Sequence, residues 1–239
     1  MPAKVLPDGV LDRLAQRAPR LAAYVDWCDH GNMWAAGGPM NGQVARRRMI
    51  RRLACVIDAT AVVETGTYRG ETTAFLADVT GAPTFSCELT PRYHEYVVRR
   101  FRRRRDIEIT RADSRSFLRD LAQRADVPDR DVLFYLDAHW YRDLPLADEL
   151  ELIHQHWERS TIVVDDFEVP GDQGYGFDDY GPGRRLTASY LPDAVMVGRT
   201  ALYPAVDAAD ETGARRGCVV IVDDDLAAAV PRDVGLRVR

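Results

Sequence analysis

Residues 62–76, VVETGTYRGETTAFL, predict a buried strand, a turn bracketed by glycines and the start of a helix. The run 59–63 is small and β-branched, as in parallel strands that are covered on both faces. Gly66 and Gly70 bracket the turn, and glycine permits a tight backbone path and the close approach of a ligand. Residues 74–76 begin an apolar helical pattern. A strand, a glycine turn and a helix in this order form the ligand pocket of doubly wound α/β folds.

The turn has the pattern Glu-x-Gly-x-x-x-Gly and lacks the Gly-x-Gly-x-x-Gly fingerprint of dinucleotide sites. Glu64 precedes the first glycine, where it would repel a pyrophosphate and favour a cationic or amine-bearing ligand. The motif resembles the first motif of class I S-adenosylmethionine (SAM)-dependent methyltransferases. That resemblance implies cofactor-binding positions at Glu64, Thr65, Gly66, Thr67, Tyr68, Gly70 and Thr72.

Composition places the chain among ordinary globular proteins. Its 239 residues suffice for one large α/β domain, and 46% are hydrophobic and 29% charged. The sequence shows neither an apolar run of membrane-spanning length nor a signal-peptide core, so we expect a cytoplasmic protein. Residues 1–130 carry a net charge of +6 and residues 131–239 one of −11. The acidic half holds most of the expected chemistry, which favours a bound cation over a bound polyanion.

The N-terminal residues 1–55 are expected to form a helical cap or lid on a domain that spans residues 56–239. Residues 8–30 predict an amphipathic helix that Pro19 breaks. Residues 30–42 are rich in glycine and either fold over a pocket or form a surface connection. A further helix is expected over residues 43–55, with an apolar inner side and five arginines on its polar side: Arg46, Arg47, Arg48, Arg51 and Arg52.

Five β-α units follow, which predict a parallel sheet with helices on both faces. After the first strand, strands are expected at 84–88, 107–110, 132–136 and 161–164, and intervening helices at 93–105, 116–125 and 146–158. Two more strands, 194–198 and 217–222, would close one edge as an antiparallel hairpin. The chain from about residue 41 to 225 thus resembles the class I methyltransferase fold. The expected fold class is α/β, a doubly wound, mostly parallel sheet of seven strands.

Acidic residues follow all five of these parallel strands, at the sheet edge where such folds bind ligands. Glu88 comes 22 residues after Gly66, near the spacing at which an acid binds ribose hydroxyls. Asp113 and Ser114 resemble the methyltransferase motif that contacts adenine. The resemblance therefore implies a SAM site built from the glycine turn and these acids.

Asp137, Asp165 and Asp166 follow two adjacent strands and would lie close together. Unneutralised, they would repel one another and raise at least one pKa, and a hard cation such as Mg²⁺ would relieve this. The arrangement resembles the metal-dependent O-methyltransferases that act on catechols and macrolide sugars (the macrocin and mycinamicin type) and the cephalosporin hydroxylase-like group. In that case Asp137, Asp165 and Asp166 would be metal ligands. The alternative for Asp166 is a turn cap.

His139 lies two residues after Asp137 and could remove the proton of an acceptor hydroxyl. The alternative is a packing role. Asp137 would take part in catalysis with it, and in relatives it also faces the SAM amine. The loop 169–181 offers aromatic and acidic side chains for an acceptor, unless it is simply a surface loop.

The expected function is a SAM-dependent, Mg²⁺-assisted O-methyltransferase that acts on a small-molecule or sugar hydroxyl. Two alternatives remain: a metal-independent N- or C-methyltransferase, and a non-catalytic relative that binds SAM or a nucleoside. The basic run 99–105 suggests a nucleic-acid contact, but the chain is acidic overall, which favours a solvated helix face or a subunit contact. We therefore expect no nucleic-acid and no membrane partner, and a possible homodimer.

Overall fold

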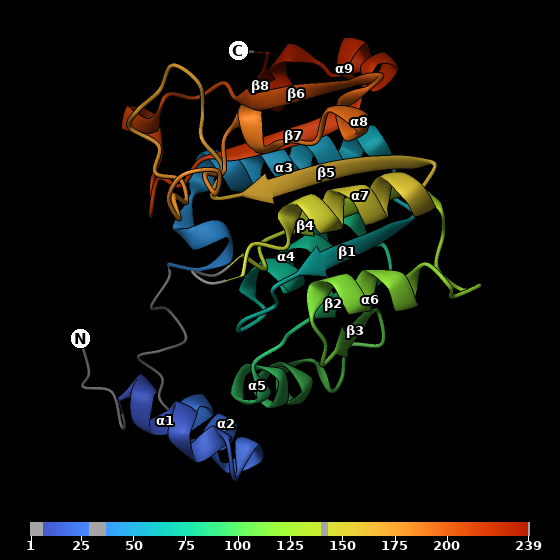
Figure 1. Cartoon of the computed structure of the whole chain (residues 1–239). Coiled ribbons are helices and arrows are strands. Elements are labelled where there is room, and N and C mark those ends of the chain that lie inside the picture. Colours follow the sequence, from blue (N-terminus) through green and yellow to red (C-terminus); the bar gives the residue numbers. More distant parts are fainter. Residues whose placement is uncertain (1–6, 29–36, 140–142, 239) are drawn as a thin grey trace.

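The structure is a computed structural model that describes residues 7–28, 37–139 and 143–238 (Figure 1). In chain order the helices are α1 (Asp8–Ala15), α2 (Pro19–Cys28), α3 (Val44–Ile57), α4 (Glu71–Thr80), α5 (Pro91–Phe101), α6 (Ser114–Leu121), α7 (Leu146–His156), α8 (Asp193–Met196) and α9 (Asp224–Ala229). The strands are β1 (Ala61–Thr65), β2 (Thr84–Cys87), β3 (Ile107–Thr110), β4 (Arg130–Leu136), β5 (Arg159–Asp165), β6 (Arg199–Pro204), β7 (Cys218–Asp223) and β8 (Leu236–Arg237). Short 3₁₀ turns are η1 (Pro39–Gly42), η2 (Ala188–Tyr190), η3 (Ala208–Asp210) and η4 (Arg232–Val234).

A single mixed sheet runs through the described residues in the strand order β3-β2-β1-β4-β5-β7-β6-β8. The first five strands in this order pair in parallel, with Val63 beside Phe85 and Phe134. β7 then pairs antiparallel with β5 and β6, which confirms the predicted closing hairpin. The two-residue strand β8 extends the sheet beyond the seven strands that the sequence predicts. The carboxyl ends of β1 to β5 therefore share one edge.

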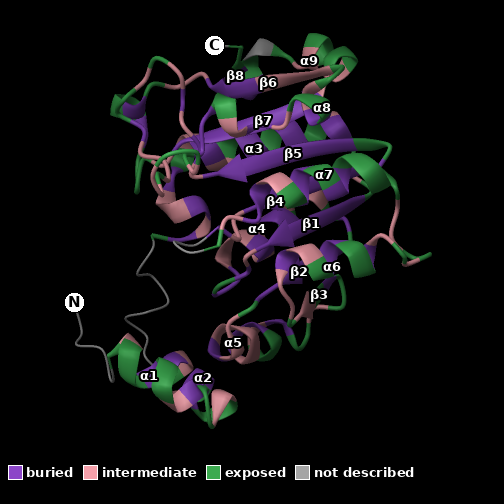
Figure 2. Ribbon diagram, viewed as in Figure 1, coloured by how far each residue is buried: buried purple, intermediate pink, exposed green. Residues whose placement is uncertain are grey.

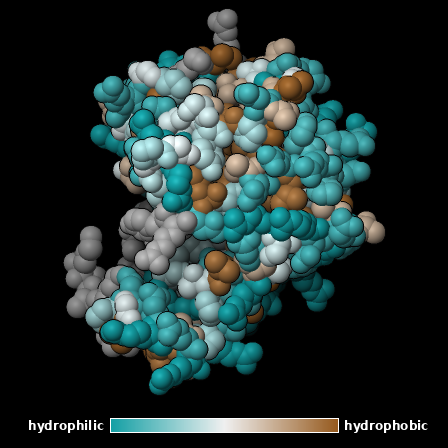
Figure 3. All heavy atoms as spheres, viewed as in Figure 1, coloured by the Kyte–Doolittle hydropathy of each residue, from teal (hydrophilic) through white to brown (hydrophobic). Residues whose placement is uncertain are grey.

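The two faces of the sheet are covered by different helices (Figure 1). Strand residues alternate between two apolar clusters, as the two-residue repeat of a strand requires. One cluster joins alternate strand residues to α6 and α7, and the other joins the remaining ones to α3 and α4. The central strands are accordingly buried, while exposed residues follow the outer sides of the helices (Figure 2). The face in Figure 3 is mostly hydrophilic, with small, scattered hydrophobic groups.

The helices of the N-terminal residues 1–55 pack at two different positions in the fold. Pro19 begins α2, so the predicted helix break is confirmed, and α1 and α2 lie beside α5 rather than on the sheet (Figure 1). Helix α3, by contrast, packs directly on the sheet. The predicted lid segment, residues 30–42, lies partly outside the described residues, which do not include 29–36. The end of the segment forms η1. No helix in the described ranges has the length and apolar character needed to cross a bilayer.

The predicted strand 194–198 is wrong. Residues Asp193–Met196 form the short helix α8, and the strand begins at Arg199. Pro192 precedes a first-turn aspartate, which is a helix start. Val195 is fully buried while Val197 is 76% exposed, so the apolar residues do not share a strand face. Gly198 then turns the chain with φ of 73°.

Candidate active site

The glycine turn joins β1 to α4 as the sequence predicts, and its backbone is tightly constrained. Gly66 has φ of 89°, and a Cβ placed there would lie 2.4 Å from the backbone oxygen of Asp137. Gly70 has φ of 74°, and its Cβ would meet the ring of Phe101 at 2.6 Å. Both positions therefore require glycine. The first of them brings the turn into contact with the chain that follows β4.

Glu64 lies within β1 and is buried, at 1% exposure. One of its carboxylate oxygens accepts hydrogen bonds from Thr73 in α4 and from Ser86 in β2, the latter at 2.6 Å. Burial raises the pKa of Glu64 to about 7, although the two hydroxyl hydrogen bonds oppose the shift. The Glu64 side chain therefore links β1 to α4 and to β2, directly beside the glycine turn. Next to it, Thr67 shares a 2.6 Å hydrogen bond with Ser86.

Glu88, the predicted ribose-binding residue, follows β2 directly and binds the backbone of the glycine turn and of its own loop. Its two oxygens accept hydrogen bonds from the amides of Tyr68 at 2.8 Å and Thr90 at 2.7 Å. Burial raises the pKa of Glu88, although these backbone hydrogen bonds oppose the shift. The Thr90 side chain and the Leu89 backbone oppose the shift as well, so several donors already surround the carboxylate. Tyr68 itself has φ of 49° and is 43% exposed.

Asp113 and Ser114 begin α6, and both have local contacts. Asp113 caps the helix by accepting from the amide of Arg115, and it also binds the Arg115 guanidinium at 2.9 Å, which lowers the pKa of Asp113. The Ser114 hydroxyl is buried beside the carboxylate of Glu149, which also faces Thr65. Burial raises the pKa of Glu149 to about 7. The Asp113 carboxylate is thus already bound by the arginine two residues further along the chain.

Asp137, His139 and Asp166 come together beyond the ends of β4 and β5. Each offers one ligand atom, and these atoms lie within 4.8 Å of one another. His139 is 3% exposed, and neither of its ring nitrogens has a hydrogen-bond partner among the described residues. Burial lowers the pKa of His139, so its imidazole is neutral near neutral pH. Burial and the nearby carboxylates of Asp165 and Asp166 raise the pKa of Asp137.

Asp165 has a different set of contacts from its two predicted partners. Its carboxylate accepts hydrogen bonds from Arg46, from Tyr135 at 2.7 Å and from the amide of Asp166 at 2.9 Å. Burial would raise the pKa of Asp165, but Arg46 and Tyr135 outweigh it, so the pKa is lowered. An internal arginine therefore neutralises Asp165. The expectation that Arg46 lies on the polar side of its helix is wrong, since it is 3% exposed.

Arg216 pairs with Asp166 at 2.5 Å and also with Asp178. The pKa of Asp166 is about 6, because burial and the nearby Asp165 raise it against the effect of Arg216. Asp178 belongs to the loop that follows β5 and accepts a hydrogen bond from Tyr180 of that loop, whose hydroxyl oxygen also lies 3.3 Å from the backbone oxygen of His139. The loop therefore lies against the cluster of Asp137, His139 and Asp166, which is called the acidic cluster below.

Sequence reasoning missed Arg46, Tyr135, Glu149 and Arg216. Helical spacing could have indicated Arg46, which lies on the same face as Ile50, Leu53 and Ile57, and Glu149, which lies with Leu146 and Ile153. No local pattern indicates Arg216.

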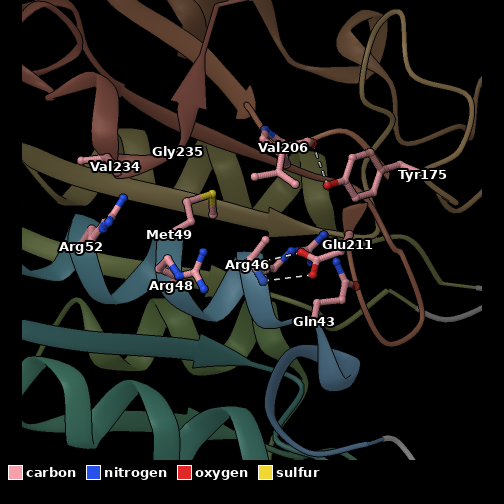
Figure 4. Close-up of a pocket in the computed structure, with 12 residues that line it drawn as sticks. Gln43, Arg46, Arg48, Met49, Arg52, Tyr175, Val206, Glu211, Val234 and Gly235 are labelled. Carbon is pink, nitrogen blue, oxygen red and sulfur yellow. Dashed lines mark hydrogen bonds between the residues drawn. The ribbon is translucent and has the colours of Figure 1, made fainter. Parts of the chain in front are cut away.

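A cavity of about 90 Å³ lies elsewhere, between α3 and the β6–β8 edge (Figure 4). Its lining includes Arg46, Met49 and Tyr175. The Glu211 carboxylate, which also lines it, accepts a hydrogen bond from the backbone amide of Arg46. Asp137 and Asp166 do not line it. The cavity is therefore separate from the acidic cluster, although Arg46 lines it.

The strand order, the glycine turn after β1 and the antiparallel closing strands define the class I methyltransferase fold. Solved structures agree with this assignment. One is an O-methyltransferase from Bacillus cereus in complex with S-adenosylhomocysteine (SAH), with a TM-score of 0.59 and 14% identity over 90% of this chain and 97% of that one.

Two further structures have the same architecture. TomG, an O-methyltransferase of tomaymycin synthesis from Streptomyces achromogenes in complex with SAM, has a TM-score of 0.57 and 15% identity, covering 92% of this chain and 91% of its own. Cofactor-bound Rv0187 from MTB has a TM-score of 0.54 and 20% identity, covering 93% and 98%. No protein-family model matches the sequence, and neither does any curated protein. The likeness therefore concerns the fold.

Proposed function

We propose that the chain is a SAM-dependent O-methyltransferase assisted by a divalent cation. One observation carries the proposal: the cofactor turn and the acidic cluster are in contact, because a Cβ at Gly66 would lie 2.4 Å from the backbone oxygen of Asp137. A methyl donor in the turn and an acceptor at the cluster would then be neighbours. Class I relatives with SAM or SAH bound share the fold.

The residues around the turn fit SAM. Glu88 would accept hydrogen bonds from the ribose hydroxyls, and the chain from Thr65 to Thr72 would surround the methionine part. Asp113 and Ser114, at the start of α6, would lie beside the adenine. The glycine turn is supported by the side chains of Glu64, Thr67 and Thr73. Their polar atoms form hydrogen bonds to one another or to Ser86.

The acidic cluster fits a divalent cation. Asp137 and Asp166 supply the carboxylate oxygens that Mg²⁺ prefers, and the unpartnered imidazole of His139 adds a nitrogen that suits Mn²⁺ or Zn²⁺ better. Asp165, the third predicted ligand, would have to release Arg46 to join them. A bound cation would lower the pKa of an acceptor hydroxyl.

His139 would accept the hydroxyl proton if the cation is held by the carboxylates alone, since its imidazole is neutral and buried. The acceptor would lie under the loop 169–181, where Tyr180 and Asp178 face the cluster. A small molecule or a sugar hydroxyl fits this polar surrounding. A homodimer and a location in the cytoplasm stay predictions.

A metal-independent methyltransferase is the second candidate, and a specific observation favours it. Arg46 and Arg216 already neutralise Asp165 and Asp166 without a metal ion. Such a site would methylate nitrogen or carbon without needing to activate a hydroxyl. Asp137, which has no arginine partner among the described residues, is then the acid without an explanation.

The test follows methyl transfer from labelled SAM to a panel of catechols and sugars, with Mg²⁺, with Mn²⁺ and with a chelator. Metal binding is measured separately by calorimetry on wild type and Asp166→Asn. We expect turnover that the chelator abolishes, and weaker metal binding in the variant. Turnover that ignores the chelator, with no heat of metal binding, would establish the metal-independent candidate instead.

A further inference from the structure

We propose that the N-terminal helix pair α1–α2 holds the cofactor turn in its binding conformation through the ion pair between Asp26 and Arg69. Asp26 would be a positioning residue for the methyl donor, although it lies 43 residues from Arg69 in the sequence. This inference rests on the proposed function, because it assumes that SAM occupies the turn.

Arg69 belongs to the turn itself, between Tyr68 and Gly70, and it is 5% exposed. Its guanidinium contacts the Asp26 carboxylate at 2.7 Å. The same guanidinium lies 5.0 Å from the ring centre of Tyr68 and 5.8 Å from that of Tyr93, within the range of cation–π attraction. Arg69 of the turn is therefore held between α2, through Asp26, and α5, through Tyr93.

Asp26 is fully buried in α2 and lies between two arginines. Arg92 of α5, also fully buried, approaches the second oxygen of Asp26 at 3.7 Å. Arg92 in turn lies 3.5 Å from Asp8 and 3.4 Å from Asp12, both in α1. A buried charge requires partners of opposite charge, so α1, α2, α5 and the turn share one electrostatic network.

The network bears on the cofactor position through the backbone next to Arg69. Tyr68 adopts a left-handed conformation, with φ of 49°, that a residue with a side chain disfavours. In that conformation its amide donates to Glu88 at 2.8 Å, which orients the carboxylate proposed for the ribose. The carbonyl of Arg69 is also held, by Arg100 at 2.9 Å. Loss of the Asp26 contact would let the strained turn relax away from Glu88.

The first test compares SAH affinity in wild type and Asp26→Asn by calorimetry, well below the melting temperature of each. Asparagine keeps the size of the side chain but removes the charge that partners Arg69. We expect the dissociation constant to rise at least tenfold. The matched control is Arg20→Ala, which removes an exposed pair with Glu95 at the same α2–α5 interface and should leave SAH affinity unchanged.

A second measurement follows hydrogen exchange in wild type and in Asp26→Asn. Because coupling between two sites is reciprocal, SAH bound to wild type should slow hydrogen exchange of the α2 amides, Pro19–Cys28. Exchange in the distant strand β6 (Arg199–Pro204) serves as the reference for a general stabilisation. In Asp26→Asn the additional protection of α2 should disappear.

The outcomes separate the two proposals. If wild type binds SAH and Asp26→Asn binds it equally well, or if SAH leaves α2 exchange unchanged relative to β6, the coupling does not exist while the methyltransferase proposal stands. If wild type fails to bind SAH at all, both proposals are wrong. Reduced affinity in Arg20→Ala as well would assign the effect to general docking of α2 and overturn the role of Asp26.

Discussion

Glu64 is a carboxyl group whose burial makes the stability of the protein depend on pH. Its pKa rises from 4.5 to about 7 on folding, so the native chain holds a proton that the unfolded chain has already lost. The free energy of unfolding must therefore fall as pH rises from about 4.5 to about 7, and a shift of this size corresponds to about 3 kcal/mol.

Glu64→Gln should remove this pH dependence while an amide oxygen still accepts from Thr73 and Ser86. Relative to wild type, we expect the variant to gain about 3 kcal/mol between about pH 5 and about pH 8. Urea unfolding at both pH values measures the difference. Glu151→Gln, an exposed position, is the control. Parallel pH profiles for wild type and Glu64→Gln would contradict the account.

His139 is the residue whose replacement should separate chemistry from binding. Its side chain reaches the acidic cluster but not the cofactor turn, with Nε2 4.0 Å from Asp137. As a general base it would contribute roughly a hundredfold or more to the rate. We expect His139→Gln to reduce the rate of methyl transfer by that factor while SAH affinity, measured by calorimetry, stays within about twofold. A full rate in this variant would exclude the base role.

At the scale of the elements, the turn between β1 and α4 depends on two separate properties of glycine. Gly66 has a positive φ and no room for a Cβ, whereas Gly81 at the end of α4 has φ of 67° and nothing within 4 Å. Gly81→Ala should cost about 1 kcal/mol, the cost of the left-handed conformation alone. Gly66→Ala should cost at least about 3 kcal/mol and abolish SAH binding. Equal melting temperatures for the two variants would refute the close contact with Asp137.

The elements themselves were largely predictable because their signals are local. Apolar runs, glycines and prolines predicted the five parallel strands and the four helices between them, and the acids that follow the strands indicated the edge that we propose binds ligands. The partners of those acids were not predictable. Arg46 is 119 residues from Asp165, and Arg216 is 50 residues from Asp166, so no local pattern joins them. The strand 194–198 failed because an apolar run alone does not distinguish a strand from a helical turn.

At the scale of the whole molecule, the start of α3 closes onto the start of β7. Gln43 is fully buried, and its side-chain amide donates to the carbonyl of Arg216 and accepts from the amide of Arg216, both at 2.9 Å. These bonds join the first and last thirds of the chain beside the acidic cluster. They hold Arg216, which pairs with Asp166, in place.

Gln43→Ala should therefore destabilise the fold by about 1–3 kcal/mol, because it leaves the amide of Arg216 without its partner, while Arg46 still donates to the carbonyl of Arg216. Gln155→Ala, on the exposed side of α7, should change stability by less than about 0.5 kcal/mol. Chemical unfolding of the two variants measures the contrast. A cost at Gln43 no larger than at Gln155 would show that this closure contributes nothing.

The proposed SAM site is the edge formed by the ends of β1 and β2. Calorimetric titration of SAH into wild type and Glu88→Gln tests whether SAM binds there. We expect one SAH to bind per chain of wild type, and we expect the loss of the charged ribose acceptor in Glu88→Gln to weaken binding at least about tenfold. No heat of binding with wild type, or equal affinity in the two proteins, would contradict this proposal.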